Sequence, residues 1–125
     1  MKYILTCSFG KDSIATALLA LQHGEPLDEL VYSEVMFSDT VSGELPEHKR
    51  FIYETAIPYF EKRGIPTRVL RGQKTYLDCF YRIVSRGNAE GKLASFPLTG
   101  RCSIQRDCKL PPIRTYQKTL PQDTV

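Results

Sequence analysis

Near its start the chain carries the stretch Ser8-Phe9-Gly10-Lys11-Asp12-Ser13. It follows strand-forming residues 3–7 and opens a helix-forming run over 13–21. A strand, a short turn with a glycine and a helix together form an anion site, because free backbone N–H groups and the positive end of the helix dipole point into the turn. Serine hydroxyls, a lysine and a glycine that permits close approach favour such a site further. The stretch therefore predicts bound phosphate or sulfate.

Strand and helix signals continue to alternate after this stretch. A second strand is expected over 30–37, rich in β-branched and aromatic residues, and a third over 67–70. A helix is expected from Pro46 toward Arg63, kinked or split at Pro58. A further helix runs from a capping box at Thr75 and Asp78 toward Arg86, and a last helix follows an irregular segment. This order predicts an α/β fold with a parallel sheet covered by helices, linked by right-handed crossovers.

The length, the net charge and the hydropathy of the sequence limit the classes of protein to which the chain can belong. The 125 residues are expected to form a single domain, 1–125. The net charge of +3, from 17 basic and 14 acidic side chains, is too mild to indicate a nucleic-acid partner by itself. The sequence shows no signal peptide and no membrane span, so a cytoplasmic protein without a membrane partner is expected.

Four cysteines, Cys7, Cys79, Cys102 and Cys108, do not suggest a disulfide framework in a chain without a secretion signal. Cys7 and Cys79 are expected to be buried as small apolar residues. Because no C-x-x-C pair is present, a structural zinc site has weak support. An iron–sulfur cluster would need ligands that the fold brings together from distant positions, and it is not expected either.

Stretch 8–13 lacks the two glycines of a Walker A loop and is not a G-x-G-x-x-G dinucleotide motif. It resembles the PP-loop signature of the adenine nucleotide alpha-hydrolase-like superfamily, and its spelling is most similar to the phosphoadenosine phosphosulfate (PAPS) reductase-like family. The simpler alternative is an ordinary helix start at which Asp12 and the serines serve only as caps. The resemblance implies a Rossmann-like three-layer sandwich with a mainly parallel sheet.

Two later segments extend the resemblance. Asp39-Thr40 resembles the family segment after the second strand, which helps to hold the adenosine end of the nucleotide, although Val41-Ser42 precede Gly43 here. Cys102-Ser103, Lys109 and Pro112-Ile113 resemble a later family motif, at a spacing about two residues longer. Arginine and lysine side chains suit oxyanions, and this basic segment could equally be a solvated loop. The candidate nucleotide-binding residues are Ser8, Phe9, Gly10, Lys11, Asp12, Ser13, Asp39, Thr40, Arg101 and Lys109, with Arg106 as a further cation.

The resemblance leaves the reaction open. It implies an adenine nucleotide, PAPS or ATP, with Mg²⁺ placed by Asp12 or Asp39 if ATP is bound. A sulfonucleotide reductase would need the family's C-terminal Glu-Cys-Gly-Leu-His segment, which this sequence lacks, so no catalytic residue is assigned. Alternatives are an ATP-dependent enzyme that forms an adenylate and releases pyrophosphate, and a non-catalytic nucleotide sensor or accessory subunit. Family members continue into another strand, so the sheet is expected to lack that strand, and a homodimer or a partner protein could cover the edge.

Overall fold

The computed structural model describes residues 1–96, 100 and 102–125. Within these residues, three strands form a parallel sheet in the order β1-β2-β3. The protein is therefore a small α/β protein, as the alternating sequence pattern predicted. Its elements are β1 (Ile4–Thr6), α1 (Lys11–His23), β2 (Glu29–Ser33), α2 (Pro46–Phe51), the π-helical turn η1 (Ile52–Ala56), α3 (Ile57–Glu61), β3 (Thr67–Leu70), α4 (Tyr76–Phe80), the π-helical turn η2 (Gln105–Lys109) and α5 (Leu110–Gln117).

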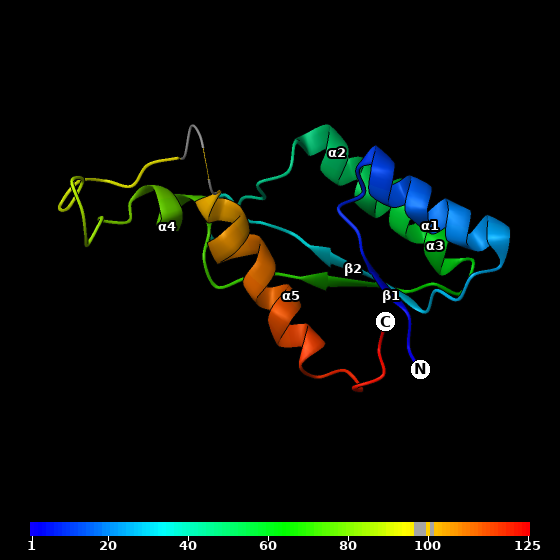
Figure 1. Cartoon of the computed structure of the whole chain (residues 1–125). Helices are drawn as coiled ribbons and strands as arrows, with labels where there is room; N and C mark the ends of the chain where they lie inside the picture. Colours follow the sequence, from blue (N-terminus) through cyan, green and yellow to red (C-terminus); the bar gives the residue numbers. More distant parts are fainter. Residues whose placement is uncertain (97–99, 101) are drawn as a thin grey trace.

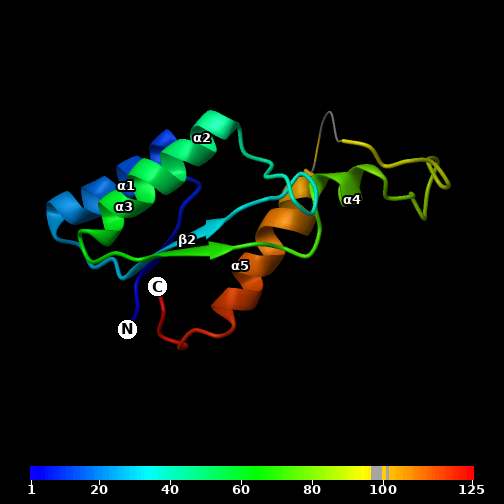
Figure 2. The same cartoon turned by 180° about the vertical axis from the view of Figure 1, so that it is seen from behind.

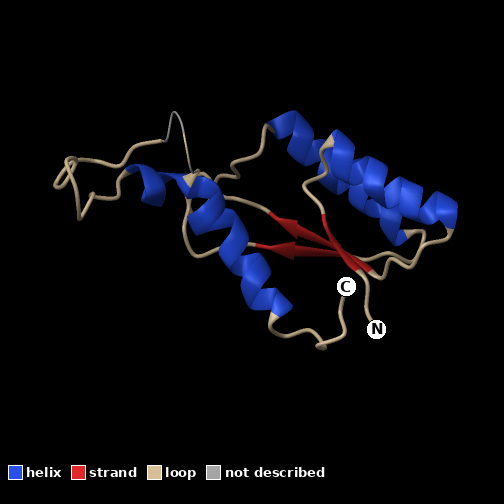
Figure 3. Cartoon of the chain, viewed as in Figure 1, coloured by secondary structure: helices blue, strands red, loops and turns tan. Residues whose placement is uncertain are grey.

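Helices lie on both sides of the sheet. Helices α1, α2 and α3 lie along one face and α5 crosses the other, while α4 leads away from the body (Figures 1 and 2). Figure 3 shows the strands between these helical layers. The main core forms between the sheet and the first layer of helices, because apolar side chains of β1, β2, α1, η1 and α3 meet there. Its buried members are Cys7, Phe9, Ala17, Leu30, Tyr32, Ile52, Ala56, Phe60 and Ile65.

Pro58 interrupts the helix that begins at Pro46, as the sequence predicted, and the chain continues in a helical path beyond it. The chain passes from α2 into η1 and then into α3, with Pro58 in the first turn of α3. A proline has no N–H for the carbonyl one turn earlier, and a π-helical turn widens the backbone just before it. Helix α3 ends at Glu61, and Gly64 follows with a φ of 78°. The expected helix from 46 to 63 is thus interrupted near Pro58.

Two elements are shorter than the sequence predicted. Strand β2 ends at Ser33 instead of reaching residue 37, because its neighbour β3 ends at Leu70 and the pairing closes with the Glu34 N–H donating to the Leu70 carbonyl at 2.9 Å. Helix α4 ends at Phe80 instead of continuing toward Arg86. It does begin with the predicted capping box, in which the Thr75 side chain accepts from the Asp78 backbone and the Asp78 carboxylate accepts from the Thr75 backbone.

A buried carboxylate, Glu29, ties the amino end of β2 to its neighbours. It accepts hydrogen bonds from Lys2 at 2.7 Å, Arg68 at 2.7 Å and Tyr116 at 2.6 Å. Burial acts to raise the pKa of Glu29, but the hydrogen bonds from Lys2, Tyr116 and Arg68 outweigh it, and the pKa is lowered. The charged form of Glu29 is therefore the one that holds β1, β3 and α5 together.

This lowered pKa predicts a pH dependence of stability. A carboxyl group with a depressed folded-state pKa stabilises the fold above its unfolded pKa, and this contribution is lost as the pH falls through the folded value. The melting temperature should therefore fall as the pH is lowered below about 4.5, the ordinary pKa of a glutamate. Glu29→Gln should have a lower melting temperature at neutral pH and a flatter profile over pH 3–5. Parallel profiles for the two proteins would contradict this role.

The cysteines lie largely as expected. Cys7 and Cys79 are buried, and so is Cys108, whose Sγ lies 3.4 Å from that of Cys79. Burial, followed by the hydrogen bond with Cys79, raises the pKa of Cys108 to about 12, so this thiol stays protonated at neutral pH. Among the described residues no three His, Cys, Asp or Glu side chains gather as a metal site, and no helix is long and apolar enough to cross a membrane.

Candidate functional site

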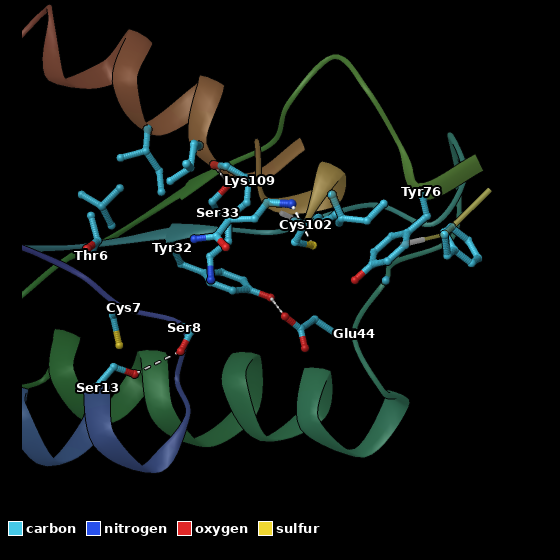
Figure 4. A pocket seen from close by; sticks show the side chains of 18 residues that line it. Thr6, Cys7, Ser8, Ser13, Tyr32, Ser33, Glu44, Tyr76, Cys102 and Lys109 are labelled. Carbon is cyan, nitrogen blue, oxygen red and sulfur yellow. Dashed lines mark hydrogen bonds between the residues drawn. The ribbon is translucent and has the colours of Figure 1, made fainter. Parts of the chain in front are cut away.

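A pocket of about 720 Å³ opens at the carboxyl ends of β1 and β2. Ligands of parallel α/β sheets bind at this end of the strands. The volume lies within the range of small-molecule sites, about 300–1,000 Å³. Figure 4 shows three groups of side chains around it, from the start of α1, from the region of β2 and the loop before α2, and from the turn η2 with the start of α5.

The first group is the N-terminal end of α1. Gly10 is its N-cap, and within the part of the chain that the structure describes no side chain caps this helix. Ser8 and Ser13 both line the pocket, with their hydroxyl oxygens 3.4 Å apart, and the Ser13 hydroxyl donates to the Gly10 carbonyl at 3.1 Å. The serines and Asp12 therefore do not act as caps, and the N–H groups of the first turn remain available to a ligand.

The turn before α1 is built on an unusual backbone. Phe9 has a φ of 58°, a left-handed conformation that is uncommon outside glycine, and its ring is 1% exposed. The ring packs edge-on against Tyr32, with centroids 5.4 Å apart. A strained backbone persists only where the surrounding packing holds it. The packing of the Phe9 side chain in the core therefore holds this turn in place. Gly10 itself has a φ of −74°, so the sharp turn predicted at this glycine occurs one residue earlier.

The second group lies around β2. The buried Tyr32 hydroxyl donates to Glu44 Oε1 at 3.0 Å, which holds the Glu44 carboxylate at the pocket wall (Figure 4). Burial and the nearby Glu44 charge raise the pKa of Tyr32, so this hydroxyl stays protonated and keeps donating. Tyr76, from α4, lines the same side, and burial followed by the charge of Glu44 raises its pKa too.

The third group comes from η2 and its approach. Ser33, at the end of β2, donates to the Lys109 carbonyl at 2.9 Å and so fastens η2 to the sheet. This contact brings Cys102, Gln105 and Lys109 to the pocket opposite the start of α1. Cys102 is the exposed cysteine of the four. The pocket thus has the hydroxyls of Ser8 and Ser13 on one wall and Lys109 on the other.

The structure brings together some of the predicted site residues and separates others. Ser8, Ser13 and Lys109 line the pocket. Gly10 adjoins it through the N-cap, and Phe9 supports it from the core. Lys11 and Asp12 lie exposed on the first turn of α1, Asp39 and Thr40 lie exposed in the loop after β2, and these four are not among the described lining residues. Arg101 lies outside the described residues.

Several lining residues were missed by the sequence analysis. Glu44 and Gly43 follow the predicted Asp39-Thr40 pair, and the antiparallel bridge between Met36 and Ser42 carries them to the wall. The signal for this shift was present, since Val41-Ser42 separate Asp39-Thr40 from the glycine. Tyr32 and Tyr76 carried no such signal, because an aromatic residue in a strand or helix usually indicates core packing.

Comparisons with protein-family models, curated proteins and solved structures gave no match for this chain. The resemblance to the PAPS reductase-like family therefore rests on the residues quoted above, and the pocket gives a physical basis on which to test it.

Proposed function

We propose that this protein binds an adenine nucleotide in the 720 Å³ pocket, as a Rossmann-like PP-loop protein of the PAPS reductase-like type. The observation that carries the proposal is the uncapped start of α1, with the hydroxyls of Ser8 and Ser13 opening into that pocket. Backbone donors at a helix N-terminus suit a phosphate group. The ordinary alternative, a helix start closed by its own side chains, lacks support from the described contacts.

The remaining walls suit the rest of a nucleotide. The carboxylate of Glu44 can accept hydrogen bonds from ribose hydroxyls or an adenine amino group, the role expected of Asp39 from the sequence. The rings of Tyr76 and Phe96 line the same pocket and offer faces for an adenine base. We therefore assign the base and ribose to the Glu44 and Tyr76 side and the phosphate to the α1 side.

Lys109 favours a nucleotide with two anionic groups. It lines the pocket on the wall opposite Ser8 and Ser13. One phosphate on the serine wall and a second phosphate or a sulfonate near Lys109 would satisfy both walls. This arrangement supports a sulfonucleotide such as PAPS as the preferred ligand, with ATP as the alternative.

A thermal-shift panel tests this proposal. The intact protein is heated with PAPS, adenosine 3′,5′-bisphosphate, AMP, and ATP with Mg²⁺. A ligand at 100 times its dissociation constant should add about 2.7 kcal/mol of stability. Selective stabilisation by the 3′-phosphorylated nucleotides supports the sulfonucleotide assignment, and selective stabilisation by ATP supports the alternative. A panel without any shift would contradict nucleotide binding.

Lys11 provides a sharper test of phosphate binding on the α1 side. Lys11 lies exposed in the first turn of α1 and does not line the described pocket, so its proposed role requires its flexible side chain to turn toward the phosphate. Lys11→Ala should weaken nucleotide binding by about 1.5–3 kcal/mol, the contribution of a charge-assisted hydrogen bond. Lys62→Ala is the matched control, because it removes the same charge at the far end of α3. Equal affinity of both variants in calorimetry would reject the role of Lys11.

A further inference from the structure

Residues 80–96 form an arm that stands away from the body of the protein (Figures 1 and 3). Its two sides pair through an antiparallel bridge between Ile83 and Leu93. Backbone hydrogen bonds from Val84 to Lys92 and from Ala94 to Arg82 extend this pairing. The arm is thus a backbone-paired extension that begins where α4 ends.

The arm and its base carry a surplus of positive charge. The whole chain has 17 basic and 14 acidic side chains. Residues 71–96 contain five of the basic and two of the acidic ones, which leaves twelve of each in the rest of the chain. This segment therefore has a net charge of +3; residues 97–125 also have +3, and residues 1–70 have −3. In the described structure, Arg71 pairs with Glu34, whereas Lys74, Arg82, Arg86 and Lys92 are in no salt bridge.

A row of aromatic rings connects the pocket with the arm. Neighbouring ring centroids lie 6.3, 5.9, 4.9 and 5.0 Å apart along the row. Tyr81 is 61% exposed, and Phe37 and Phe96 are about two-fifths exposed. Two inner members of the row, Tyr76 and Phe96, also line the pocket, so the row passes the pocket. We call this row the aromatic strip, and it consists of Phe37, Tyr76, Phe96, Phe80 and Tyr81.

We infer that the arm and the aromatic strip bind a single strand of nucleic acid. Exposed rings offer flat faces on which unpaired bases stack, and adjacent lysines and arginines attract the phosphate backbone. A duplex has its bases already stacked on each other, and an acidic peptide would use the cations without using the rings. The presence of cations and exposed rings on the same segment therefore favours a single strand over both. Tyr76 and Phe96 are shared with the proposed nucleotide pocket, whereas the exposed Tyr81 ring and the cations of the arm lie outside the described lining and carry this inference whichever ligand occupies the pocket.

Fluorescence anisotropy of the intact protein with labelled 15-nucleotide oligouridylate and oligothymidylate tests the inference. We expect both strands to bind more tightly than a duplex of equal length. Tyr81→Ala should weaken binding about 5- to 150-fold, the range for losing one base–aromatic stack. Phe51→Ala is the control for Tyr81→Ala, because Phe51 is also an exposed aromatic residue, with the same 40% exposure as Phe96, but lies on α2 and not in the aromatic strip.

The salt dependence tests the cations separately. Each neutralised phosphate of a single strand contributes about −0.7 to the slope of log affinity against log salt. Replacing Arg82, Arg86 and Lys92 by glutamine should make the slope shallower by about two. The same change at Lys62, Arg114 and Lys118, outside the arm, should leave it unaltered. The inference is overturned if single strands do not bind, if a duplex binds equally well, if polyglutamate competes as strongly as the oligonucleotide, or if the two triple variants behave alike.

Discussion

Replacing Arg71 by methionine should lower the free energy of unfolding by about 3 kcal/mol, at the low end of the range for breaking a buried ion pair. Glu34 has no exposed surface, and Arg71 donates to its Oε2 through Nη2 at 2.9 Å and Nε at 3.2 Å. Tyr53 donates to the other carboxylate oxygen at 2.9 Å. Without Arg71 the buried carboxylate loses its cationic partner, and the Tyr53 hydroxyl is the donor that remains among the described contacts. Urea unfolding of the two proteins measures the difference.

Removing the charge of the other partner, Glu34, should lower the free energy of unfolding by less. Glu34→Gln keeps an acceptor for Tyr53, and the Arg71 side chain, which is 54% exposed, can remain hydrated. We therefore expect a loss of about 1 kcal/mol, the net contribution of one hydrogen bond. If Glu34→Gln lowers the free energy of unfolding as much as Arg71→Met does, then the loss in Arg71→Met does not come from leaving a buried carboxylate without its cation.

Gly43→Ala should distort the pocket wall and destabilise the protein by about 1–3 kcal/mol, the usual cost of overpacking. An added Cβ would lie 2.6 Å from the Val35 carbonyl oxygen and 2.6 Å from Cε2 of the Tyr76 ring. The backbone carbonyl cannot move aside without shifting the loop that carries Glu44. Calorimetry with the preferred nucleotide and thermal unfolding should both register the change.

Val41→Ala is the matched control for this loop. Val41 is 54% exposed and lies two residues earlier, so its truncation should leave both stability and nucleotide affinity nearly unchanged. A Gly43→Ala protein with unaltered stability and affinity would show that Tyr76 yields easily and that the wall does not depend on Gly43.

Much of the fold could be predicted from local signals. Strand β3 has the predicted bounds, the Thr75 and Asp78 capping box forms, and Gly24 ends α1 with a φ of 67°. Each of these features depends on neighbouring residues in the chain. The end of β2 depends on where its neighbour β3 ends, which is a contact with a distant part of the chain that a local pattern does not contain.

The residues of the site also divide into those placed by neighbouring residues in the chain and those placed by distant contacts. Ser8 and Ser13 could be predicted because the loop and helix that place them are contiguous in sequence. Glu44 and Gln105 reach the pocket through tertiary contacts, the Tyr32 hydrogen bond and the attachment of η2 to Ser33. The whole-chain net charge of +3 also gave no sign of the arm, because it does not show that residues 1–70 are net acidic and that residues 71–96 are net basic.

Titration calorimetry of the wild-type protein and a Ser8→Ala/Ser13→Ala variant, each with the four nucleotides of the thermal-shift panel, tests the central claim most directly. The two hydroxyls lie at the pocket end assigned to phosphate. We predict that the wild-type protein binds at least one of these nucleotides, and that the variant, with its fold confirmed by circular dichroism, binds it at least about 10-fold more weakly, since each hydrogen bond to a charged group contributes about 1.5–3 kcal/mol. No binding by the wild type, or equal affinity of the two proteins, would contradict the assignment of this pocket.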